Sequence, residues 1–187
     1  DQFKLVTHCL NDEEGQQNIL REYLGYKLYN VLTDQSFRVK LVEVTYMDIS
    51  GSMESMTRYG FLIEDVDEMA DRLQGEEYEM MNLPKESFDP YQCMLQSMFQ
   101  FMIANSDYDM AMARNVKFVK LDYSEKVLAV PYDFDFSGLV NASYAIPDPN
   151  TNQESVTDRI YKGDKCSDTV VRYTVDYMQS KKEDLLA

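Results

Sequence analysis

Hydrophobic spacing in the first third of the chain predicts a strand, a helix and a hairpin. Apolar residues recur at steps of three and four from Leu20 to Val31, which predicts an amphipathic helix over 17–33. Three other segments are β-branched and aromatic, or alternate with a period of two, and turn residues lie at 48–55 between the last two. The strands are expected at 3–9, 37–47 and 58–63.

The widest apolar stripe runs from Phe88 to Ile103 and predicts a helix at the centre of the core. The other predicted elements are a short helix at 65–73, strands at 115–121 and 127–131, and weaker helices at 153–162 and 167–182. The first of these weaker helices is expected to end at Gly163 as a C-cap. A small antiparallel sheet followed mainly by helices is typical of the α+β class.

Composition and charge exclude several classes of function. The 187 residues include 33 acidic and 18 basic side chains, for a net charge of −15, and 44% are hydrophobic, enough for a core. This charge opposes binding to the phosphate backbone of nucleic acids, and no apolar run is long enough to span a membrane. The three separated cysteines do not predict a disulfide framework, and a single histidine excludes Ser-His-Asp and Cys-His hydrolases. The start at Asp1 is expected for a mature chain or a fragment.

Two polar segments carry the candidate chemistry. The loop at 105–114 contains Asp107 and Asp109 and leads to Asn115, and a hairpin later the chain reaches Asp133 and Asp135. A helix, an Asp loop ending in Asn, a hairpin and a further Asp follow the order of a protein-kinase catalytic core, in which these oxygens orient the acceptor hydroxyl and hold Mg²⁺. Because Asp, Asn and Ser are also common turn residues, a purely structural role is the alternative.

Several motifs resemble the CotH-type family, the spore-coat protein H kinases, and especially its uncharacterised exported relatives. The matching segments are 4–7, 21–29, 59–67, 105–107 with Asn115, and 130–135. The match covers about residues 3–140, and the last segment, VPYDFD, is the most specific. The resemblance implies a kinase-like fold and an exported or cell-envelope protein that transfers phosphate from ATP to a protein hydroxyl.

Carried over by position, the resemblance assigns a role to each candidate residue. Asp107 is implied to be the base or orienting group for the acceptor hydroxyl. The implied binding residues are Lys4, Glu22 and Glu64 for ATP, and Asn115, Asp133 and Asp135 for Mg²⁺ or Mn²⁺. Glu22 is implied to pair with Lys4 on the phosphates, and Glu64 to lie near the adenine.

Some alternatives stay open at this stage. Asp107 and Asn115 are eight positions apart, whereas the ordinary kinase loop has five, so Asp109 is a second candidate for the acid in the site. The expected division is a partial N-lobe at 1–64, truncated at its N-terminal end, and a helical C-lobe at 65–187. The alternative function is a degenerate or truncated kinase fold that serves as a secreted binding or structural module. A metal-dependent phosphoesterase ranks last, because a second carboxylate cluster for a two-metal centre is absent from the sequence.

Overall fold

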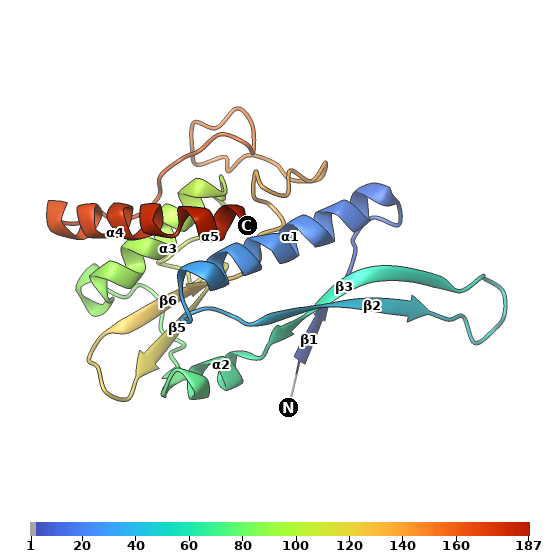
Figure 1. Ribbon diagram of the computed structural model, residues 1–187, viewed down its shortest axis with the longest axis horizontal. Coiled ribbons are helices and arrows are strands. Elements are labelled where there is room, and N and C mark those ends of the chain that lie inside the picture. Colours follow the sequence, from blue (N-terminus) through green and yellow to red (C-terminus); the bar gives the residue numbers. More distant parts are fainter. Residues whose placement is uncertain (1–2) are drawn as a thin grey trace.

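Two three-stranded antiparallel sheets and five α-helices make up residues 3–187, the part of the chain that the computed structural model describes (Figure 1). The first sheet has the order β1-β3-β2, from strands Phe3–Val6, Val39–Tyr46 and Met56–Glu64. The second sheet has the order β4-β5-β6, from strands Gly75–Glu77, Val116–Leu121 and Val127–Pro131. These small antiparallel sheets with separate helices confirm the α+β class.

The helix α1, Glu13–Leu32, crosses the molecule between the first sheet and the C-terminal helices (Figure 1). It begins where the Asp12 carboxylate accepts the backbone N–H of Gly15, four residues before the predicted start. The predicted stripe is not its buried face, since Leu20 and Leu24 are exposed. The buried positions are Gly15, Asn18, Ile19, Glu22, Gly25, Tyr26, Tyr29 and Leu32. Two polar residues of this face line a cavity, so apolar spacing alone selected the wrong side.

The region after the first sheet holds one predicted helix and one strand that the sequence did not predict. The helix α2, Val66–Arg72, begins at Asp65, whose side chain caps the N–H of Asp67. The polar strand β4 pairs antiparallel with β5. A side chain at Gly75 would lie 2.3 Å from the carbonyl oxygen of Lys120, so the close pairing requires glycine.

The predicted central helix is α3, Pro90–Met102, preceded by a 3₁₀ turn at Lys85–Ser87. Asp89 caps its first turn, and Phe99 is fully buried. One hydrophobic cluster joins α1, the first sheet, α3 and strands β5 and β6, and it contains Tyr29, Phe61 and Phe134. The core therefore extends across residue 64, where the two lobes were predicted to meet.

The C-terminal part differs from the prediction at one helix. Helices α4, Asp168–Ser180, and α5, Lys182–Leu186, account for the predicted helix at 167–182. The helix predicted at 153–162 is wrong, because this segment has no regular secondary structure and Gly163 caps nothing. Its side chains bind the local backbone instead: the Asp158 carboxylate accepts the N–H groups of Glu154 and Ser155.

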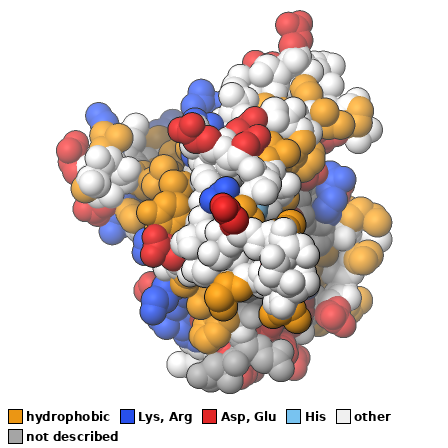
Figure 2. All heavy atoms as spheres, turned by 90° about the vertical axis from the view of Figure 1, so that its right-hand side faces the viewer, with side chains coloured by type: hydrophobic (Ala, Val, Ile, Leu, Met, Phe, Trp, Pro, Cys, Tyr) orange, Lys and Arg blue, Asp and Glu red, His pale blue; other side chains and the backbone are white. Residues whose placement is uncertain are grey.

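One face of the surface shows how the charged residues are distributed. On the face shown in Figure 2, acidic side chains lie among basic and hydrophobic ones. Within residues 3–187, no helix is long and apolar enough to cross a membrane.

Candidate functional site

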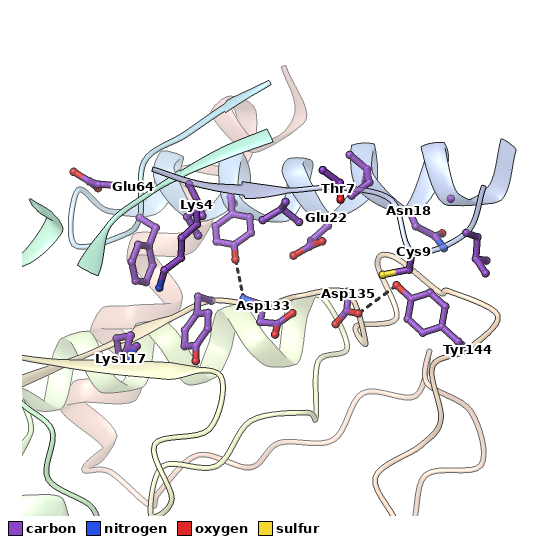
Figure 3. Close-up of a pocket in the computed structure, with 18 of the residues that line it drawn as sticks. Lys4, Thr7, Cys9, Asn18, Glu22, Glu64, Lys117, Asp133, Asp135 and Tyr144 are labelled. Atoms are coloured by element: carbon purple, nitrogen blue, oxygen red, sulfur yellow. Dashed lines mark hydrogen bonds between the residues drawn. The ribbon is translucent and has the colours of Figure 1, made fainter. Parts of the chain in front are cut away.

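A cavity of about 320 Å³ lies between the layer of β1 and α1 and the segment that follows β6. Figure 3 shows Glu22 reaching down from α1 toward Asp133 and Asp135 on the opposite side, with Asn18 farther along α1, above Cys9 and Tyr144. Five of the seven residues predicted for the site line it: Lys4, Glu22, Glu64, Asp133 and Asp135. The cavity thus brings together predicted site residues from the first third of the chain and from the segment after β6.

Strand β6 and the buried Phe134 hold the two aspartates in place. All five residues of β6 are buried, and Phe134 is fully buried with its ring centroid 4.7 Å from that of Tyr26 and 5.6 Å from that of Phe99. Asp133 has a left-handed backbone with φ of 61°, and its N–H donates to the Tyr26 hydroxyl at 2.8 Å. With Phe134 anchored in the core, the carboxylates on either side of it are directed into the cavity (Figure 3).

Like charges gather in this cavity. Burial, followed by repulsion from Asp133 and Asp135, raises the pKa of Glu22 to about 8. Burial and the neighbouring Asp135, with a smaller effect from Asp107, raise the pKa of Asp133 to about 7. These acids raise one another's pKa because their negative charges repel one another where burial already disfavours the charged form. A bound cation would remove that penalty.

Asp107 and Asn115 lie together despite their separation in the sequence. The Asn115 amide Nδ2 donates to the Asp107 backbone carbonyl at 2.7 Å and to its carboxylate Oδ2 at 3.1 Å. Asp109 and Arg114 exchange two backbone hydrogen bonds of 3.0 Å, which close the intervening residues into a small loop. The extra residues therefore project from the chain without separating Asp107 from Asn115.

The same loop distinguishes the two candidate acids. The Asp109 carboxylate accepts the N–H of Met112 and so stabilises the turn. Asp107 instead contacts Asn115, lies 3.5 Å from an Arg114 guanidinium nitrogen, and acts electrostatically on Asp133. Neither Asp107 nor Asn115 lines the cavity itself, but the geometry favours Asp107 over Asp109 as the loop acid of the site.

The residues predicted to contact the nucleotide are only partly arranged as expected. Lys4 extends from β1 toward the side of the cavity that carries Asp133 (Figure 3), but no ion pair within residues 3–187 joins it to Glu22. Glu64 is directed away from the cavity, and its carboxylate takes two hydrogen bonds from Arg72, at 2.7 and 2.9 Å. The Glu64 carboxylate thus holds α2 against the first sheet, and only the rest of this residue faces the cavity.

Among the lining residues that were not predicted, three bear on the site: Tyr144, Tyr26 and Asn18. The Tyr144 hydroxyl donates to Asp135 at 3.2 Å, and Tyr26 holds the backbone of Asp133. Asn18 is 6% exposed, with neither polar atom of its amide bonded within the described residues. Asn18, Glu22 and Tyr26 follow one another at steps of four, so the one signal available in the sequence was a polar row on a helix.

Comparison with family models, with curated proteins and with solved structures finds no match for this chain. In the described part of the chain, no three carboxylates, thiols or imidazoles lie close enough together to hold a metal ion by themselves. A cation in this cavity would therefore need ligands beyond the carboxylates.

Proposed function

We propose that this chain is a kinase-like domain similar to the CotH-type family, which binds ATP with Mg²⁺ or Mn²⁺ and transfers phosphate to a protein hydroxyl. The observation that carries the proposal is the meeting of Asp107 and Asn115 beside Asp133, which follows the intervening hairpin and faces a cavity. The exported or cell-envelope location implied by the resemblance belongs to the same proposal.

The donor set fits a hard divalent cation that shares its ligands with a nucleotide. Asp133 and Asp135 supply carboxylate oxygens, and the Asn115 amide, whose nitrogen is turned to Asp107, has its oxygen Oδ1 left as an acceptor. Mg²⁺ in such sites commonly takes one or two carboxylates and completes its coordination with phosphate oxygens and water. The cation would neutralise charge on the transferred phosphoryl group.

The remaining residues would orient the reactants. Asp107 would accept the proton of the acceptor hydroxyl, and its contact with Asn115 keeps it beside the metal ligands. Lys4 is the candidate contact for the phosphates, because it extends from β1 into the cavity (Figure 3). The cavity would exclude water from the reacting groups around Glu22, which is 5% exposed.

Calorimetric titration with the non-hydrolysable analogue AMP-PNP tests the proposal, with and without Mg²⁺ or Mn²⁺. Asp133→Asn is the informative variant, because asparagine keeps the size of the side chain and tolerates the positive φ. Wild type is expected to bind only with metal, and Asp133→Asn at least about tenfold more weakly, in line with losses seen around metal ligands. Asp109→Asn, in the same loop but used by the local turn, is the matched control and should bind like wild type.

Equal binding heats for wild type and Asp133→Asn, or binding that ignores the metal, would contradict the proposal. Transfer of phosphate from radiolabelled ATP to dephosphorylated casein then tests catalysis. Metal-dependent binding without any transfer, to casein or to water, favours the degenerate binding module over the enzyme.

A further inference from the structure

The irregular segment that replaces the predicted helix at 153–162 packs against the loop that carries Asp107. Lys162 Nζ donates to the backbone carbonyls of Ser106, at 2.7 Å, and of Tyr108, at 3.0 Å, which are the residues on either side of Asp107. The same ammonium donates to the Asp148 carboxylate at 2.8 Å. Gln153, from the same segment, accepts the hydroxyl of Ser106 at 2.5 Å.

These bonds use the whole donor capacity of Lys162. An ammonium group has three N–H donors, and its three partners here leave none for a ligand. The Lys162 side chain is 22% exposed and that of Asp148 only 8%, so the ion pair is shielded from solvent. The ammonium also lies 5.4 Å from the centre of the Tyr108 ring, which favours its position further.

One cation that binds both flanking carbonyls restricts how the peptide groups around Asp107 can turn. The Ser106 carbonyl belongs to the peptide group that precedes Asp107, and the Tyr108 carbonyl to the peptide group that follows Tyr108, so Lys162 holds the backbone on both sides of Asp107. The N–H of Asp107 is held as well, by the Oδ1 of Asn105 at 3.0 Å. Asn115 holds the carboxylate from the other side. Without Lys162, the two carbonyls would lose their shared donor and the loop could rotate.

We propose that Lys162 is a positioning residue for Asp107, acting through the Ser106 and Tyr108 carbonyls without touching nucleotide, metal or acceptor. This inference rests on the proposed function, in which Asp107 takes the proton of the acceptor hydroxyl. It assigns a task to the irregular segment at 158–163. Lys162 should affect the transfer step and leave nucleotide binding unchanged, since within residues 3–187 it forms no hydrogen bond or ion pair with the residues proposed to bind metal and phosphate.

The test compares Lys162→Met with Asp148→Asn in two measurements: AMP-PNP affinity with Mg²⁺, and kcat for transfer to dephosphorylated casein. Lys162→Met removes the donor, whereas Asp148→Asn removes the charge of its partner and leaves both carbonyl contacts in place. For Lys162→Met we expect kcat to fall by about 100-fold, as for a misplaced reacting group, with the AMP-PNP affinity unchanged. For Asp148→Asn we expect kcat to stay close to that of wild type.

Each other outcome has a definite meaning. A Lys162→Met protein with wild-type kcat overturns the inference, and so does a parallel loss of affinity and kcat, which would indicate general damage to the site. If Lys162→Met does not fold because Asp148 is left buried and unpaired, the double variant with Asp148→Asn replaces it in both measurements. A wild-type chain that shows neither metal-dependent binding nor transfer overturns the proposed function itself. Wild-type activity with an unaffected Lys162 variant overturns this inference alone.

Discussion

The buried carboxyl group of Glu22 gives the structure a measurable dependence of stability on pH. Its pKa is raised from 4.5 to about 8 by burial and by Asp133 and Asp135, and only 5% of its surface is exposed. Between these two pH values the folded chain keeps a proton that the unfolded chain has released. This contribution to stability is therefore fully present below pH 4.5, is lost as the pH rises toward 8, and stays lost above it.

Replacing Glu22 by Gln removes this dependence, because the amide has nearly the same shape and does not titrate. One pH unit corresponds to about 1.4 kcal/mol in the free energy of unfolding. Relative to pH 4.5, Glu22→Gln should therefore gain about 3 kcal/mol over wild type at pH 7, and about 4 kcal/mol above pH 8. Urea unfolding of both proteins, at pH values from 4.5 to 8.5 and without divalent metal, measures this difference.

Glu13→Gln is the matched control, because Glu13 lies on the same helix but is exposed. Its difference from wild type should remain within a few tenths of a kcal/mol at every pH, as is usual for a surface position. If the difference between Glu22→Gln and wild type is as flat as that of the control, Glu22 does not carry a raised pKa. The reasoning about repulsion between buried carboxylates in the cavity would then be refuted, and with it the main electrostatic support for a cation there.

Two further substitutions test how the site is held in place. Arg72→Met should cost about 3–5 kcal/mol in the free energy of unfolding, because it leaves the buried carboxylate of Glu64 without its partner. The exposed Arg172→Met is the control and should cost little. Similar urea midpoints for the two variants would show that the ion pair is dispensable. Tyr26→Phe should cost about 1–3 kcal/mol in the free energy of unfolding, because the backbone N–H of Asp133 loses its acceptor. It should also weaken metal-dependent AMP-PNP binding. A variant with unchanged unfolding and binding would show that this hydrogen bond does not hold Asp133 in place.

Local patterns in the sequence were sufficient to predict the helices and strands that have a clear hydrophobic period, cap or turn of their own. The β2–β3 hairpin follows from alternation on both sides of a turn, and α3 follows from a wide apolar stripe behind the Asp89 cap. The sequence also placed Asp133 and Asp135 directly after a short strand, which is the buried β6. In these cases the chain within about 15 residues determines the outcome, and distant contacts only reinforce it.

Tertiary contacts decided which face of α1 is buried, which segment stays irregular, and which candidate residues become neighbours. The buried face of α1 contains Asn18 and Glu22 because that side lies over a cavity, which the apolar spacing of the helix does not reveal. The residues at 153–162 stay irregular because their polar groups form hydrogen bonds with one another and with the Asp107 loop, in place of the backbone bonds of a helix. The sequence named Asp107 and Asn115 as candidates eight positions apart, but only the folded loop between them makes them neighbours.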